Sequence, residues 1–237
     1  MKNRFHLDAA YEPGTTLELT GSEFHHAVKV ARLKIGEPIE LFDGRGNAAA
    51  ATVRSISGDR AGVLVDSLPV PSRESSFRLV LAMSLIHLDR FELVLQKSTE
   101  LGVHGIVPLI ADRSEIRLER IRGRADRWSK IVLEAVKQSG RSRLPELSEA
   151  RSPVEVLKGE GPFVLFEGEE PSAGELQSGS GATLLIGPEG GWSEREIAIA
   201  RERGAVFRSL GPRRLRAETA AIAALTAIGG EYGDLRA

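Results

Sequence analysis

The chain lacks cysteine entirely: none of its 237 residues carries a thiol. Disulfide bonds, thiolate metal ligands and covalent catalysis by a cysteine nucleophile are therefore excluded. The five histidines show no zinc-binding pattern either, and the two adjacent ones, His25 and His26, would point in different directions on a helix. We therefore expect no bound metal.

Long apolar segments are also missing. No apolar run approaches the roughly 18 residues of a membrane-spanning helix, and the N-terminal sequence MKNRFHLDAA lacks the apolar stretch of a signal peptide. Hydrophobic residues make up 41% of the chain and charged residues 27%, as in soluble globular proteins. The sequence therefore predicts a cytoplasmic protein that does not associate with membranes.

The net charge of −1 argues against indiscriminate binding of nucleic acid, but the charge is unevenly distributed. From Arg113 to Arg143 there are ten Lys or Arg residues and four Asp or Glu residues, and ten minus four leaves +6. Two interpretations stay open. The segment is either a solvated helix face with internal ion pairs or a strip that faces RNA.

The first 70 residues have the pattern of short strands separated by Gly, Pro and Asp turn signals, with one helix that begins at Ser22. This pattern predicts a small closed β-barrel. A segment rich in Pro and Ser, LPVPSRESS, follows from Leu68 to Ser76, so we place the first domain at 1–70, a linker at 71–76 and a second domain at 77–237. The expected strands are Phe5–Leu7, Leu17–Leu19, Ile39–Phe42, Ala48–Ile56 and Ala61–Leu68.

After the linker, apolar runs alternate with segments of helical period, which predicts an α/β domain with a parallel sheet. The continuous apolar run Phe77–Met83 is typical of a strand buried on both faces. The other expected strands are Gly105–Ile110, Pro162–Phe166, Thr183–Ile186 and Val206–Leu210, and the expected helices are Asp89–Leu101, Ala125–Ser139, Glu194–Arg203 and Ala217–Ile228.

Two glycine-bearing segments near the C-terminus are the most informative feature. They are LLIGPEGGW, Leu184–Trp192, and LGPRRLRAETAAIAAL, Leu210–Leu225. In each, a strand ends in Gly-Pro and leads toward a helix, so two strand ends side by side would form a ligand-binding crevice at the carboxyl edge of the sheet. Glycine there lets a ligand approach the main chain closely.

The spacing of these glycines fits neither the dinucleotide fingerprint nor the P-loop. Ser193 and Glu196 form a capping box that starts the helix after the first segment. Two ordinary strand-to-helix turns are the alternative interpretation. The charges of Arg213, Arg214, Arg216 and Glu218, directly before an Ala-rich helix, argue against it.

Nearly the full length resembles the RsmE family of 16S ribosomal RNA uridine N3-methyltransferases, in the SPOUT class. Trp192 stands where many members carry Phe or Leu, and Arg214 where an aliphatic residue is usual. The matching blocks are Arg4-Phe5, His26 to Arg32 with Gly36, Leu41 to Gly44, Gln96 to Gly102, Pro108-Leu109, Arg113-Ser114, Glu134 to Arg141, Pro145-Glu146 and the two glycine-bearing segments.

The resemblance implies a PUA-like β-barrel joined to an α/β domain with a parallel sheet and a C-terminal trefoil knot. It implies S-adenosylmethionine (SAM) as methyl donor, a homodimer, and 16S rRNA of the small ribosomal subunit as substrate, modified at uridine 1498 in rRNA numbering. Two alternative functions stay open: a non-catalytic RNA-binding or ribosome-assembly factor, and a SPOUT methyltransferase acting on tRNA. The helical run AAIAALTAI, 220–228, has few polar groups to face water and is compatible with the homodimer.

Carried over residue by residue, the resemblance assigns SAM binding to the two glycine-bearing segments and the end of the strand before them. The expected residues are Phe166, Glu167, Ile186, Gly187, Pro188, Gly190, Gly191, Leu210, Gly211, Leu215, Arg216, Ala217 and Thr219.

Methylation at N3 fits the absence of cysteine, because enzymes that modify pyrimidine C5 usually need a thiolate. Negative charge develops on the uracil carbonyl oxygens as the N3 proton leaves, and a fixed guanidinium would stabilise it. We expect Arg216 in this role, with Glu218 orienting it or polarising the acceptor; the group that takes the proton is left open. Arg213 and Arg216 as phosphate-binding or helix-capping residues are the alternative. The expected RNA-binding residues are Arg4, Arg32, Arg113, Arg122, Arg124, Arg141 and Arg213.

Overall fold

A computed structural model describes residues 3–68, 70–166, 176 and 181–235. The chain divides into two units, one of Met1–Glu74 with Val136–Leu144, and one of Ser75–Ala135 with Pro145–Ala237. The boundary between the units, at Glu74 and Ser75, lies within the expected linker at 71–76. The assignment of 136–144 to the first unit was not anticipated from the sequence.

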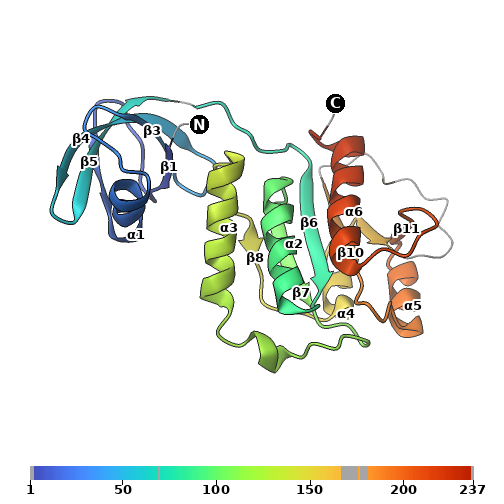
Figure 1. The fold of residues 1–237 in the computed structure, drawn as a ribbon. Helices are drawn as coiled ribbons and strands as arrows, with labels where there is room; N and C mark the ends of the chain where they lie inside the picture. Colours follow the sequence, from blue (N-terminus) through green and yellow to red (C-terminus); the bar gives the residue numbers. More distant parts are fainter. Residues whose placement is uncertain (1–2, 69, 167–175, 177–180, 236–237) are drawn as a thin grey trace. The chain divides into compact units, whose positions relative to one another are not determined.

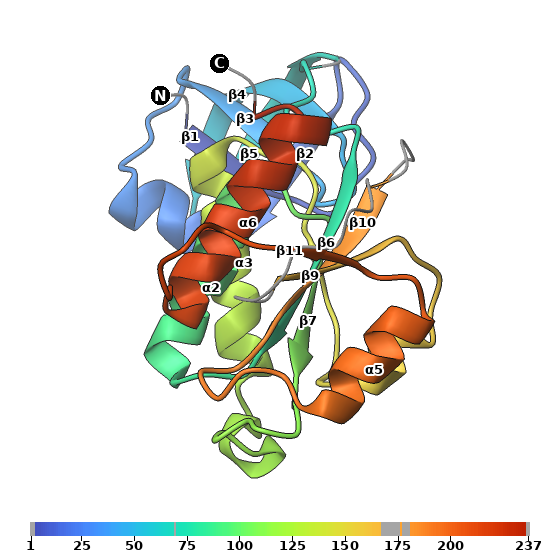
Figure 2. The same ribbon diagram turned by 90° about the vertical axis from the view of Figure 1, so that its right-hand side faces the viewer.

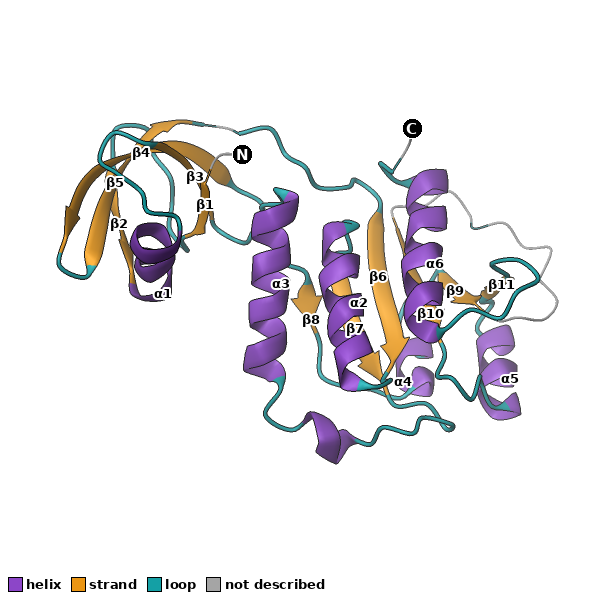
Figure 3. Ribbon diagram, viewed as in Figure 1, coloured by secondary structure: helices purple, strands orange, loops and turns teal. Residues whose placement is uncertain are grey.

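The first unit is built on a five-stranded, curled sheet with the order β1-β3-β4-β5-β2 (Figures 1 and 3). Its strands are β1 (Asn3–His6), β2 (Thr16–Thr20), β3 (Pro38–Phe42), β4 (Ala48–Ser57) and β5 (Arg60–Ser67). The strands β1 and β3 are parallel and the other neighbours antiparallel. Apolar side chains on one face, such as Leu19, Ile39 and Val63, are fully buried. All five expected strands are confirmed. The expected closure of the barrel is not seen, because among the described strands β1 and β2 are the two edges of the sheet and do not pair with each other.

The expected helix of this unit is also present, and its side chains Phe24, Ala27 and Val28 pack on the core of the sheet. It consists of α1 (Gly21–His25) and a π-helical turn, His26–Val30. Arg32 follows with φ of 53°, the left-handed conformation that ends the helix.

The second unit contains a six-stranded parallel sheet with the order β11-β9-β10-β6-β7-β8. Its strands are β6 (Arg78–Ser84), β7 (Gly105–Leu109), β8 (Glu146–Leu147), β9 (Phe163–Phe166), β10 (Gly181–Ile186) and β11 (Val206–Arg208). Alternate residues of β6 pack into two different clusters, Leu81 and Met83 into one and Ala82 into the other. This confirms that β6 is buried on both faces.

Helices cover both faces of this sheet (Figure 2). On one face lie α2 (Leu88–Glu100) and α6 (Ala217–Tyr232), together with Trp128 from α3 (Ala125–Ser139). On the other lie α4 (Pro153–Leu157) and α5 (Glu194–Glu202). The short elements β8, α4 and a 3₁₀ turn at Leu118–Ile121 were not expected, because two to five residues carry too little periodicity. Strand order does not test the trefoil knot, which stays a prediction.

Candidate functional site

Three neighbouring strands end at the same level of the sheet. Ile186 at the end of β10 is in register with Phe166 at the end of β9, and Phe166 is in register with Arg208 at the end of β11. The two glycine-bearing loops therefore do not leave adjacent strands, as the sequence suggested, because β9 lies between them. The carboxyl ends of all three strands form the floor of the site.

The loop after β10 is a tight turn followed by a helix cap. The N–H of Gly191 donates to Pro188 O at 2.9 Å, and Gly191 has φ of 71°, which favours glycine. The Ser193 hydroxyl accepts from Glu196 N while the Glu196 carboxylate accepts from Ser193 N. The predicted capping box is thus confirmed, and it fixes the direction in which α5 leaves the loop.

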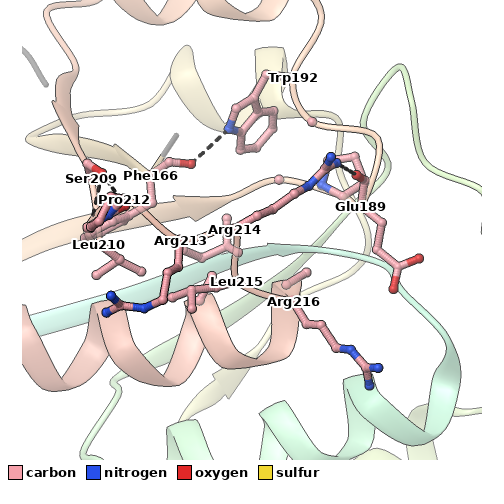
Figure 4. A pocket seen from close by; sticks show the side chains of 17 residues that line it. Phe166, Glu189, Trp192, Ser209, Leu210, Pro212, Arg213, Arg214, Leu215 and Arg216 are labelled. Atoms are coloured by element: carbon pink, nitrogen blue, oxygen red, sulfur yellow. Dashed lines mark hydrogen bonds between the residues drawn. The ribbon is translucent and has the colours of Figure 1, made fainter. Parts of the chain in front are cut away.

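Gly187 is required by the close approach of an aromatic ring. A Cβ at this position would lie 2.9 Å from Cε2 of Trp192, which is too close for two carbon atoms. The indole is 4% exposed, and its Nε1–H points to Phe166 O at 3.4 Å (Figure 4). Trp192 thus ties the β10–α5 loop to the end of β9.

A cavity of about 720 Å³ opens between the two glycine-bearing loops (Figure 4). This volume is within the range of about 300–1,000 Å³ that is usual for small-molecule sites. Ten of the thirteen residues expected to bind SAM line it: Phe166, Ile186, Gly187, Pro188, Gly191, Leu210, Gly211, Leu215, Arg216 and Ala217. Five further lining residues were not predicted from the sequence: Glu189, Trp192, Ser209, Pro212 and Ala220. Arg213, predicted to bind RNA, and Arg214 also line the cavity.

The other three expected SAM-binding residues have different placements. Gly190 and Thr219 are not among the lining residues. A Cβ on Gly190 would lie 3.2 Å from Cβ and O of Arg113, so this glycine permits close packing against the loop that follows β7. Glu167 lies outside the described residues.

Three arginines of the β11–α6 loop line the cavity and extend in different directions (Figure 4). Arg214 Nη2 donates to Glu189 O at 2.9 Å and so connects the two glycine-bearing loops. Arg213 and Arg216 are exposed and point to opposite sides. Arg214, which stands where the family usually has an aliphatic residue, therefore has a structural role here.

Glu218 has a different partner from the one expected. Its side chain is held by Arg90 of α2, with Arg90 Nε at 3.7 Å from Glu218 Oε1, and no interaction between Glu218 and Arg216 is seen among the described residues. Glu218 is 9% exposed, and its Oε2 is buried without a hydrogen-bond partner among the described groups. Arg90 Nη1 also donates to Glu189 Oε1 at 2.8 Å.

Two of the expected RNA-binding arginines are internal. Arg4, 8% exposed, donates from Nε to Glu40 Oε1 at 2.7 Å and from Nη1 to Arg141 O at 2.8 Å. Arg141, 2% exposed, donates to Glu74 Oε2 at 2.7 Å. Because their guanidinium groups are buried and paired inside the first unit, we withdraw both from the RNA-binding set.

The basic segment from Arg113 to Arg143 is likewise divided. Arg124 lies 3.8 Å from Glu92, and Arg127 donates twice to the same carboxylate at 2.6 Å. The hydrogen bonds from Arg127 hold the pKa of Glu92 below its usual value. The exposed basic residues of this segment in the second unit include Arg113, Arg117, Arg120 and Arg122. The internal ion pairs of the first interpretation are thus seen for Arg124 and Arg127, whereas RNA contact by the exposed residues stays a prediction. Arg32 of the first unit is exposed as well.

The two units of the chain match the two domains of a class of RNA-modifying enzymes. Residues 73–229 match the family model of an RNA methyltransferase domain, and residues 19–65 match that of an RNA methyltransferase PUA domain. Ribosomal RNA small subunit methyltransferase E of Bacillus subtilis is 34% identical over 95% of this chain and 94% of its own length. The protein of that name from Rickettsia conorii is 32% identical with the same coverage. The chain belongs to the ribosomal RNA small subunit methyltransferase E family.

Solved structures support this membership. The structure of a ribosomal RNA small subunit methyltransferase E from Neisseria gonorrhoeae bound to S-adenosyl methionine is 33% identical, with a TM-score of 0.91 and complete coverage of both chains. A methyltransferase from Legionella pneumophila in complex with SAM is 32% identical, with a TM-score of 0.87, and covers 99% of this chain and all of its own.

Two further observations concern the described residues only. No helix among them is long and apolar enough to cross a membrane. They also contain no group of three or more His, Asp or Glu residues placed to hold a metal ion.

Proposed function

We propose that this chain transfers a methyl group from SAM to N3 of a uridine in 16S ribosomal RNA. The observation that carries the proposal is the cavity at the ends of β9, β10 and β11. This cavity is lined by residues of the two loops that match the family.

The lining fits a donor with an adenine ring, a ribose and an amino-acid head. Leu210, Leu215 and Ala217 offer apolar surface to a flat ring. At Gly191 and Gly211, which both have positive φ, a Cβ would meet no atom within 4 Å, so main chain borders open space there. When bound, SAM supplies an electrophilic methyl group on its sulfonium.

The chain's own residues act on the acceptor. A uridine N3 in a duplex is engaged in base pairing, so the target base has to be unpaired or flipped out. Arg216 lines the cavity and is exposed, which leaves its guanidinium accessible to a uracil carbonyl oxygen. Its charge would stabilise the negative charge that the ring gains as the N3 proton is released.

The remaining interactions are part of the same proposal. Exposed arginines of the second unit and Arg32 of the first hold RNA phosphates, and the active protein is a cytoplasmic homodimer without a metal. The apolar side chains Leu225 and Ile228 of α6 are fully buried inside the second unit, so they do not themselves form the dimer interface. The face of α6 that carries Thr226 and Ala227 is exposed.

Nucleoside analysis tests the function. Small ribosomal subunits from a strain that lacks this modification are incubated with the protein and SAM, and the 16S RNA is digested to nucleosides. We expect 3-methyluridine. Only 5-methyluridine, a 2′-O-methyl nucleoside or no product at all would contradict the proposal, and 3-methyluridine in tRNA alone would favour the tRNA alternative.

A further inference from the structure

A second cavity lies beside the proposed donor cavity, within the same unit. Its volume is about 200 Å³. Three segments form its walls: the turn from β6 into α2, the loop that follows β7, and the β10–α5 loop. Pro188 and Glu189 line both cavities. Pro188 and Glu189 therefore stand between a group bound in the second cavity and a methyl donor bound in the first.

The size and the apolar walls suit one flat ring. At about 200 Å³, the cavity is below the range of about 300–1,000 Å³ for whole small-molecule ligands. Leu85, Ile86 and Ile116 contribute apolar surface. Enzymes that act on a flipped base hold it between such side chains and read its Watson–Crick edge by hydrogen bonds.

The polar lining favours a neutral base over a phosphate. Arg90 and Arg113 contribute two guanidinium groups, Glu115 and Glu189 contribute two carboxylates, and His87 contributes an imidazole. With the histidine neutral, the formal charges of the lining cancel. Arginine donates hydrogen bonds only, whereas a carboxylate accepts them. The edge of uracil presents one N–H between two carbonyl oxygens, which needs both kinds of partner. A phosphate would gain no net attraction from this lining.

Arg90 is held in place by the β10–α5 loop and by the first turn of α6. Its Nη1 donates to Glu189 Oε1 at 2.8 Å, and its Nε lies 3.7 Å from Glu218 Oε1. Glu218 is 9% exposed, and its Oε2 is buried without a hydrogen-bond partner among the described groups. The two carboxylates therefore hold the Arg90 guanidinium in position before substrate binds. Glu218 Oε2 keeps a hydrogen-bond acceptor position that no described group occupies. A hydrogen-bond donor that is already in position needs no reorganisation when charge develops on the substrate.

We propose that the second cavity receives the uracil ring of the target nucleotide, and that Arg90 donates a hydrogen bond to one of its carbonyl oxygens. The inference rests on the proposed function, since it names the binding site for the acceptor of that reaction. Arg90 then acts on the ring from α2, separately from Arg216 in the β11–α6 loop.

Filling the cavity tests the proposal. Ile116 lines it, whereas Leu118, two residues further on, is 47% exposed and does not. Ile116→Trp should lower the rate of methyl transfer to small ribosomal subunits at saturating SAM at least tenfold, while the Kd for SAM, measured by calorimetry, stays within twofold. The matched control Leu118→Trp should leave both values close to those of the wild type. An unchanged rate in Ile116→Trp would overturn the proposal.

A second variant guards against misfolding of the first. Arg90→Lys keeps the charge but loses the planar fork, so we expect the rate to fall about tenfold or more with SAM binding intact. If Ile116→Trp loses SAM binding, Arg90→Lys decides, and a normal rate in that variant overturns the proposal.

A direct probe identifies the site of contact. A 16S RNA fragment transcribed with 4-thiouridine is irradiated with the protein, and the adducts are mapped by mass spectrometry. We expect adducts in residues 85–90 or 113–116, and their loss in Ile116→Trp. Adducts confined to other segments, with wild-type methylation intact, would refute the base pocket alone. Absence of 3-methyluridine with the wild-type protein would refute the proposed function instead.

Discussion

Replacing Gly187 by alanine should impair SAM binding through Trp192. The new Cβ would lie 2.9 Å from Cε2 and 3.1 Å from Nε1 of the indole. The ring is 4% exposed and packs in a core cluster, and it also lines the donor cavity, so a displacement of the ring is felt at the SAM site. Either the ring or the β10–α5 loop must shift, and both line the donor cavity.

The size of the effect follows from the cost of overpacking. Extra carbon atoms in a well-packed core cost about 1–3 kcal/mol. Since about 1.4 kcal/mol corresponds to a tenfold change in an equilibrium constant, the Kd for SAM should rise roughly five- to 150-fold if the cost falls on the loop that binds the donor. Isothermal titration calorimetry with SAM measures this change, and circular dichroism verifies that the variant is folded.

Two further variants isolate the contact. In Gly190→Ala the new Cβ meets Arg113 at 3.2 Å and lies outside the cavity lining, so SAM affinity should change much less. In a Trp192→Leu background the smaller side chain relieves the clash, so Gly187→Ala should cost less there than in the wild type. Such a double-mutant cycle measures the coupling between two residues in contact. Equal costs in the two backgrounds would refute the reasoning, as would wild-type affinity in Gly187→Ala.

The remaining predictions concern catalysis, stability, RNA binding and assembly. Arg216→Ala should slow methyl transfer by about 10²–10³-fold, the scale for one electrostatic donor, with a much smaller change in SAM affinity. Glu74→Ala should lower the free energy of unfolding by about 3–5 kcal/mol, because Arg141, 2% exposed, would stay buried without its counter-charge. Burial acts to raise the pKa of Glu74, but the hydrogen bonds and charge of Arg141 outweigh it and hold that pKa below its usual value. The stability contributed by Glu74 is therefore complete above the carboxylate's unfolded pKa and is lost as the pH falls through its lower folded pKa. Charge reversal at Arg120 and Arg122 should weaken RNA binding, which should itself fall steeply with salt, and leave SAM affinity unchanged. Light scattering of the active protein should give twice the monomer mass of 25.6 kDa.

Controls accompany these predictions. The ion pair between Arg45 and Asp8 is exposed on both sides, at 62% and 66%, so Asp8→Ala should change the unfolding free energy by less than about 1 kcal/mol. Urea titrations of both variants, repeated from pH 7 to pH 3, measure the difference, which should shrink toward acid pH. A Glu74→Ala variant as stable as Asp8→Ala would contradict the argument. The same holds for a full rate in Arg216→Ala, unchanged RNA binding after charge reversal, or an active monomer.

Local patterns in the sequence were enough to place most of the elements. Periods of two and of 3.6 residues located the strands and the long helices, since a buried face repeats with the geometry of its own element. The helix α3 begins and ends where the sequence placed it, at Ala125 and Ser139. The capping box at Ser193 was equally readable, because both of its hydrogen bonds join residues three apart. The two loops of the site were found because their glycines and charges are contiguous in the sequence.

The site also depends on contacts between residues far apart in the chain, and these the sequence did not reveal. Strand β9 lies between β10 and β11, which brings Phe166 to the floor of the cavity and within reach of Trp192, 26 residues further on. Glu218 pairs with Arg90, a residue of another helix, rather than with the nearby Arg216.

The same reason explains the RNA-binding residues that were withdrawn. A charged residue in the sequence shows only that it needs water or a partner. Arg141 is buried because the fold brings Glu74, 67 positions earlier, against it, and Arg4 is buried because Glu40 and the carbonyl of Arg141 surround it. Local periodicity and turn chemistry determined the elements and loops of this protein. Its tertiary structure decided which charges face solvent and which side chains meet at the site, because those outcomes depend on pairings that no short segment contains.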